Sequence, residues 1–135
     1  MSALKTTRKN RRGASAVEFA FVAPVLFVIF LGSIEYARAN QVANATAYAA
    51  YQGCRRAITP GATAAKVTTA VQAVLDANLI KGSTVTVNPS TITDSTSTVT
   101  VTVSVPLNSN AWVTPKLTSG KTFSRSCTLT REKTN

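Results

Sequence analysis

A run of sixteen uncharged, mostly apolar residues, Phe19–Ile34, places the strongest constraint on the fold of this 135-residue chain. Extending the run back to Ala14 gives 21 residues, and only Glu18 interrupts them. A helix needs about 20 apolar residues to cross a bilayer. A buried core helix is the alternative, but the rest of so short a chain is too small to surround one. We therefore expect this segment to span a membrane.

Basic residues gather on one side of the apolar run. Only Arg38 follows the run closely, whereas five basic residues precede it: Lys5, Arg8, Lys9, Arg11 and Arg12. Because lysine and arginine favour the cytoplasmic side of a membrane, the N-terminus is predicted to be cytoplasmic and the chain beyond about residue 36 to lie outside. The basic cluster is then a topology signal next to anionic lipid.

The distribution of charge and of reactive residues excludes other classes of function. The net charge is +10, but the bases after residue 12 are dispersed and lack interleaved aromatic residues, so no nucleic-acid partner is expected. Histidine is absent, the five acids are scattered, and two cysteines are too few for a zinc site. Neither catalysis nor a metal or other cofactor is expected.

Two cleavage sites compete for the processing of this N-terminus. The small-residue triplet Ala37–Ala39 fits a conventional secretory signal and would leave Asn40 as the new terminus. However, the apolar run is long for that class, and Glu35 precedes the cut. The other boundary is Gly13, between the basic and apolar runs, and cleavage after it would leave Ala14 as the terminus and retain the apolar helix.

Glu18 is an ionisable residue within the expected membrane span, where such a group costs a few kcal/mol and marks a functional candidate. If Ala14 becomes the terminus, its ammonium and Glu18 are spaced i, i+4, about 6 Å apart along one helix face. The carboxylate then neutralises the terminus of its own chain or of a neighbour. Alternatively, Glu18 lies at the headgroup level, where its charge costs little. The residues alone leave both interpretations open.

Residues 11–39, RRGASAVEFAFVAPVLFVIFLGSIEYARA, resemble the N-terminus of TadE-like minor pilins, or pseudopilins, of tight-adherence (Tad) systems, which are related to type IV pili. The matching features are Gly13 before the cut, Glu18 and Phe19 at the fifth and sixth mature positions, Pro24, Gly32, and the pair Glu35 and Arg38. TadF-like proteins share much of this N-terminus, so that subtype stays open, whereas TadG-like chains are usually much longer.

The resemblance implies a non-enzymatic minor pilin that takes part in assembling Tad pili for surface attachment. It implies cleavage by a prepilin peptidase between Gly13 and Ala14, and roles in assembly for Glu18 and Phe19. The implied partners are other pilin subunits, the inner-membrane assembly platform and the lipid bilayer. The implied location is a single pass through the inner membrane, with the C-terminal domain periplasmic or extracellular. The alternative is an uncleaved signal-anchor protein whose domain binds an envelope partner.

Pro24 lies within the expected span and removes one backbone hydrogen bond, so it should kink or loosen the helix. That loosening would help subunits pack in a filament, or it would simply be tolerated, as proline often is in membrane helices.

Three regions are expected along the chain: a basic leader over 1–13, a long helix over 14–52 that is transmembrane to about residue 34, and an exported domain over 53–135. The helix continues past the membrane because the sequence to Gln52 is rich in alanine. Its outer half is expected to pack on its own domain, on another subunit, or on both. Gly53 and the Pro60–Gly61 pair should end it.

The exported domain is predicted to hold a second, amphipathic helix and about three antiparallel strands, an α+β fold of pilin-like construction. Five apolar residues at helical spacing define the helix: Val67, Val71, Val74, Leu75 and Leu79. Lys81 and Gly82 should end it. Alternating valines within 83–105 predict two strands, one around Val85 and Val87 and one over Val99–Val105. A third strand fits 122–130, with Phe123, Cys127 and Leu129 pointing inward and Arg125 as an exception on that face. Trp112 is expected to cover the core, with a contact to a partner as the alternative.

Cys54 and Cys127 both lie outside the cytoplasm in this topology, where disulfides persist. A bond between them would close a loop of 73 residues, which the chain-entropy model values at about 4 kcal/mol. We expect this disulfide, with free thiols as the alternative.

Overall fold

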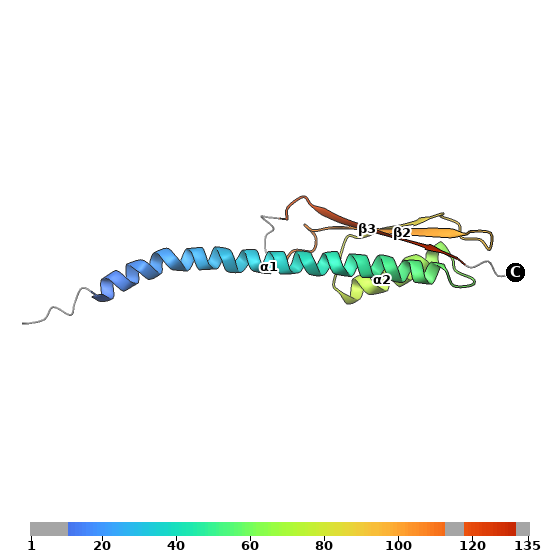
Figure 1. Cartoon of the computed structure of the whole chain (residues 1–135). Coiled ribbons are helices and arrows are strands. Elements are labelled where there is room, and N and C mark those ends of the chain that lie inside the picture. Colours follow the sequence, from blue (N-terminus) through green and yellow to red (C-terminus); the bar gives the residue numbers. More distant parts are fainter. Residues whose placement is uncertain (1–10, 113–117, 132–135) are drawn as a thin grey trace, which may run out of the picture.

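The computed structural model describes residues 11–112 and 118–131, which form two helices and one three-stranded antiparallel sheet (Figure 1). The elements are α1 (Arg11–Ala57), α2 (Ala64–Ala77), β1 (Thr84–Asn88), β2 (Thr98–Pro106) and β3 (Thr122–Thr130). The expected α+β arrangement of a long helix, a shorter helix and a small antiparallel sheet is confirmed.

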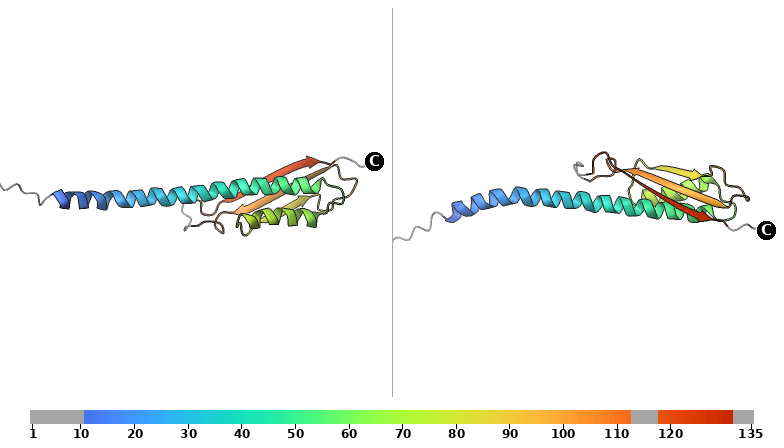
Figure 2. Two further views of the ribbon diagram at one scale, coloured as in Figure 1. Left: turned by 90° about the horizontal axis from the view of Figure 1, so that it is seen from below. Right: turned by 45° about the horizontal axis from the view of Figure 1, so that its top comes forward.

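Helix α1 has 47 residues, a length of about 70 Å, and its two halves have different surroundings. Its N-terminal half projects away from the rest of the molecule, and its C-terminal half lies along the sheet (Figures 1 and 2). None of its most apolar 18-residue stretch is buried, and Phe21 is 75% exposed. A core helix would be covered by its own domain, so this arrangement suggests a single-pass membrane anchor.

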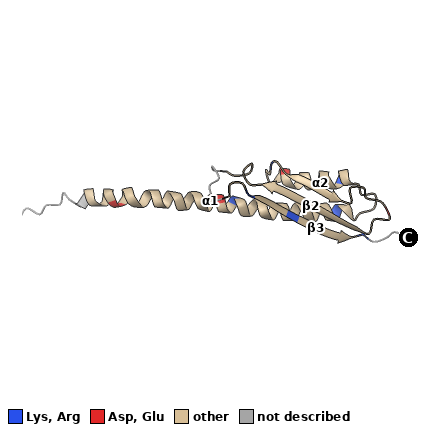
Figure 3. Cartoon of the chain, turned by 90° about the horizontal axis from the view of Figure 1, so that it is seen from above, with Lys and Arg blue, Asp and Glu red and all other residues tan. Residues whose placement is uncertain are grey.

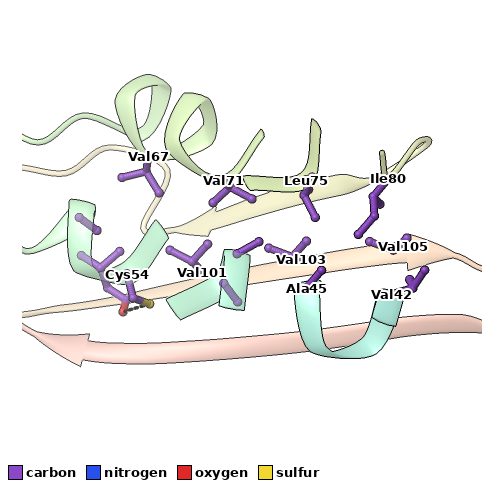
Figure 4. Close-up of a cluster of buried hydrophobic side chains, with 14 of the residues drawn as sticks. Val42, Ala45, Cys54, Val67, Val71, Leu75, Ile80, Val101, Val103 and Val105 are labelled. Carbon is purple, nitrogen blue, oxygen red and sulfur yellow. Dashed lines mark hydrogen bonds between the residues drawn. The ribbon is translucent and has the colours of Figure 1, made fainter. Parts of the chain in front are cut away.

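The sheet has the order β1-β2-β3, and one of its faces is covered by both helices (Figures 2 and 4). The inward side chains of the central strand β2 are fully buried, as the alternating pattern predicts: Val99, Val101, Val103 and Val105. On the edge strand β3, Phe123, Cys127 and Leu129 are half-buried against the same core, as expected, while Arg125 on that face is exposed. Valine therefore supplies most of the sheet's share of the core.

Helix α2 starts at a Thr63 cap, whose side chain accepts a hydrogen bond from the Lys66 N–H, and it buries Val67, Val71 and Leu75. The expected end at Lys81 and Gly82 is wrong, because α2 stops at Ala77. The N–H of Leu79 donates to the carbonyl of Asp76 (2.9 Å), and that of Ile80 donates to Leu75 (3.0 Å). This is the Schellman arrangement, and Leu79 holds the left-handed position (φ 54°) that glycine usually occupies.

Helix α1 extends five residues beyond the expected end at Gln52 and passes through Gly53. Gly53 lies where α1, α2 and β2 meet. A Cβ atom there would be 2.5 Å from Val71 Cγ2 and 3.0 Å from Val101 Cγ1. The glycine is therefore required for the close approach of the three elements, although it lowers helix propensity by about 1 kcal/mol relative to alanine.

Gly53→Ala should lower the free energy of unfolding by about 1–3 kcal/mol, because the added methyl group overpacks the core against Val71 and Val101. Urea unfolding of the full chain in detergent measures the effect. Adding Val71→Ala should reduce the penalty of the first substitution, since it removes the closest methyl group. A Gly53→Ala protein as stable as the parent would contradict this account.

Candidate functional site

One face of the free half of α1 carries a shallow apolar groove of about 250 Å³. Its lining residues recur at helical spacing: Phe19, Ala23, Leu26, Phe27 and Phe30. The groove offers almost no polar atoms, so it suits a lipid chain or the side chains of another apolar helix and cannot support catalysis on its own. Phe19, singled out from the sequence, thus lies at one end of a packing surface.

The residues predicted for processing and charge compensation all lie on the first turns of α1. Gly13, Ala14 and Glu18 are exposed, and Ala14 and Glu18 are one helical turn apart, a rise of about 6 Å. Glu18 is the only charged residue between Gly13 and Ile34, and Figure 3 accordingly shows a single acidic spot on this stretch of α1. The geometry meets the spacing that the charge-compensation hypothesis needs, and the role itself stays a prediction. Lys5, Arg8 and Lys9 lie outside the described residues, as do the side chains of Arg11 and Arg12.

Helix α1 runs through Pro24 without a break, although proline has no N–H to donate to the carbonyl of Ala20. Figure 2 shows this half of the helix as gently curved. The role of Pro24 in assembly also stays a prediction.

A second set of functional candidates lies where α1 meets the domain, just beyond the apolar run. Glu35 is 8% exposed, and its Oε1 accepts two hydrogen bonds of 2.7 Å from Thr118, one from the main-chain N–H and one from the hydroxyl. The carboxylate thereby fastens the segment before β3 to α1. A buried carboxylate is stable only with such partners.

Arg38, one turn further along α1, is 4% exposed and binds both the α2–β1 loop and the start of the β2–β3 connection. Its Nε donates to the carbonyl of Asn110 (2.8 Å), and its Nη2 donates to the carbonyl of Leu79 (3.1 Å). Its Nη1 donates to the side-chain oxygen of Gln41 (3.0 Å) and is 3.4 Å from the carbonyl of Asn78. The planar guanidinium can serve several acceptors at once, which a lysine ammonium on a flexible chain does less well.

Asn110 completes this junction and is itself 4% exposed. Its Nδ2 donates to the carbonyls of Lys81 (2.9 Å) and Pro106 (2.8 Å), while its Oδ1 accepts from the Lys81 N–H (2.8 Å). The space left among these groups is only about 10 Å³, room for no more than one water. The junction is therefore a structural clamp rather than a ligand pocket.

The sequence interpretation noted Glu35 and Arg38 as part of the resemblance but missed Asn110, Thr118 and Leu79. Nothing local marks their place in the junction, because the bonds that tie them to Arg38, Lys81 and Glu35 span 29 to 83 residues. Trp112 was predicted wrongly: it does not cover the core but is 64% exposed, with its ring 5.0 Å from the Arg38 guanidinium carbon. The buried arginine attracts the electron-rich ring face.

Cys54 and Cys127 are brought together at the far end of α1, both as free thiols. Cys54 is fully buried, as Figure 4 shows, and its Sγ donates to the carbonyl of Cys127 at 2.8 Å. The disulfide between them stays a prediction. The mass of the extracted chain before and after reduction checks it, because the disulfide form is two hydrogens lighter.

In the reduced protein, burial raises the pKa of the Cys54 thiol from 9.0 to about 12, with a side-chain hydrogen bond to Cys127 as the second cause. At pH 8 the folded chain should hold about a thousandfold fewer Cys54 thiolates than the unfolded chain, since each pKa unit is a factor of ten. Iodoacetamide should therefore label Cys54 slowly at pH 8 and faster as the pH approaches 12. The Cys127→Ser variant leaves Cys54 as the single cysteine that can be labelled. Equal labelling rates of Cys54 with and without denaturant would contradict the raised pKa.

Comparison with known proteins supports the class suggested by the anchor. Residues 13–55 match the family model described as TadE-like protein, so the resemblance is confirmed over nearly all of α1. This family suggests involvement in Tad pilus systems, and it is a pilus-associated structural family that is not known as enzymatic. The match does not include α2 or the sheet. No curated protein and no solved structure matches the chain.

Proposed function

We propose that this chain is a minor pilin of a Tad-type pilus, held in the inner membrane by α1 with its N-terminus cytoplasmic and its α+β domain outside. Its function is structural: the apolar half of α1 packs in the membrane and then among other pilin helices. The largely exposed surface of that half supports this proposal, since the groove beginning at Phe19 has no partner within the described residues.

The observation that carries the proposal is the burial of Arg38 within the domain. Conventional signal cleavage after Ala39 would remove Arg38 together with its hydrogen bonds to the carbonyls of Asn110 and Leu79. It would also remove Glu35 and its bonds to Thr118. Because the domain depends on this part of α1, the apolar helix is expected to stay attached, and processing is expected at Gly13 instead.

The mature N-terminus tests the proposal directly. Chain extracted from membranes should begin at Ala14, as judged by N-terminal sequencing and intact mass, and deletion of the prepilin peptidase should restore the full leader. A terminus at Asn40 would refute retention of the helix. An intact leader in peptidase-containing cells would instead favour the uncleaved signal-anchor protein with an envelope partner.

A further inference from the structure

The end of the domain that faces the free half of α1 carries two large apolar side chains that stay mostly exposed, Leu79 and Trp112. Helix α2 and strand β2 both end there, and β3 begins there (Figure 1). Leu79 is 75% exposed and Trp112 is 64% exposed, and Lys81 and Lys121, in the loops after α2 and before β3, are exposed as well. We call this end the basal face. We propose that the basal face rests on the bilayer, with Leu79 and Trp112 at the level of the lipid headgroups.

The position of Arg38 sets the height of the basal face. Arg38 is four residues past Ile34, the last residue of the uncharged run, a rise of about 6 Å along the helix. Each headgroup layer is about 5–8 Å thick, so this height falls within it. Helical side chains also lean toward the N-terminus, which here is toward the membrane. Since Arg38 contacts both the Leu79 carbonyl and the Trp112 ring, it holds both residues at this depth.

The conformation of Leu79 shows that folding alone does not explain a leucine at this position. Its φ of 54° is strained for a residue with a Cβ and easy for glycine. Its side chain gains little burial in return. A leucine at this position can insert its apolar side chain into the bilayer interface, whereas glycine has no side chain to insert.

The chemistry of the neighbouring residues fits the same partner. Tryptophan is enriched where membrane meets water, because its ring is apolar and its N–H needs a polar partner. Lys81 and Lys121 suit the anionic lipids of a bilayer surface. The exposed acid Asp76, in the last turn of α2, accepts a hydrogen bond from Gln72 (2.9 Å) back along that helix.

Trp112 is the only tryptophan in the chain, so its fluorescence tests the proposal without added probes. The full chain is reconstituted into vesicles of phosphatidylcholine and phosphatidylglycerol, a fraction of which is brominated either near the headgroup or near the chain ends. Trp112 should lose about half of its emission with bromine near the headgroup and much less with bromine near the chain ends, as expected for an interfacial ring. Equal emission with and without brominated lipid would overturn the proposal.

Two relocated tryptophans separate this inference from the membrane anchoring on which it rests. Trp112→Phe with Tyr51→Trp places the probe on α1 about 20 Å beyond Arg38, and it should escape quenching by either lipid. Trp112→Phe with Phe27→Trp places it in the span, where bromine near the chain ends should quench it. A quenched residue 27 with an unquenched Trp112 refutes only the basal contact, whereas two unquenched probes refute the anchor and the contact together.

Leu79→Gly should have two opposite effects: a more stable domain and a weaker contact with the bilayer. Glycine should raise the urea midpoint of the domain because it adopts the required φ without strain. The same change should weaken the quenching of Trp112 by headgroup-brominated lipid, since one apolar contact with the bilayer is lost. Unchanged quenching in a folded Leu79→Gly protein would show that Leu79 takes no part in the contact.

Discussion

Glu18→Gln should leave cleavage after Gly13 intact and reduce pilus assembly by at least tenfold. Without the carboxylate, the ammonium of Ala14 enters an apolar helical bundle with no opposite charge. An uncompensated charge in such surroundings costs several kcal/mol, and about 1.4 kcal/mol already corresponds to a factor of ten. Glutamine keeps the size and polarity of the side chain, so the loss would report the charge.

Pilus counts by electron microscopy and the N-terminus of the membrane-bound chain measure the two effects separately. Glu18→Asp is the matched control, because it retains the charge on a shorter side chain and should assemble better than Glu18→Gln. Normal assembly of Glu18→Gln would contradict charge compensation. It would leave the alternative that Glu18 lies at the headgroup level.

Arg38→Met should destabilise the exported domain by about 3 kcal/mol, the second large effect that we expect. Methionine has a similar reach but no donors, so the carbonyls of Asn110 and Leu79 lose their partner where water has little access. A hydrogen bond to a charged group contributes about 1.5–3 kcal/mol, and Arg38 makes several. The loops at the basal face should also become more accessible to protease.

Urea unfolding of the full chain in detergent gives the stability change, and Arg55→Met provides the control. Arg55 is an exposed arginine on the same helix, and its loss should cost no more than about 0.5 kcal/mol. Arg38→Lys should fall between the two, since lysine keeps the charge but cannot serve several acceptors with a planar fork. Equal stability of the Arg38→Met and Arg55→Met proteins would contradict a stabilising role for the hydrogen bonds of Arg38.

The two large effects concern the two ends of the apolar run of one helix. Glu18 lies near the start of the apolar run, and the pair Glu35 and Arg38 lies just past its end. In the proposed function, the first region governs entry into the filament and the second fixes the domain to the helix that enters it. Because Arg38 and Glu35 bind the α2–β1 loop and two points of the β2–β3 connection, movement of α1 would be transmitted to the whole basal face.

The amino-acid sequence by itself determined the elements whose signal is local. A long apolar run defines the anchor, and valine at every second residue of 99–105 defines a strand with one buried face. The predicted third strand, 122–130, has the observed bounds of β3. These predictions succeed because helical and strand periodicities record which side of a segment is apolar.

Only the tertiary structure decided which residues meet across long sequence separations. Gly53 looked like the end of a helix, but it is the point where three elements come closest. Trp112 looked like a core residue, but it lies outside on a buried arginine. The ties of Arg38 to Leu79 and Asn110 span 41 and 72 residues. These contacts depend on residues that are distant in the sequence: the carbonyls that a buried charge can reach, and the side chains that leave space for a glycine backbone. The periodicity of a single segment shows only which of its sides is apolar, so it cannot predict such contacts.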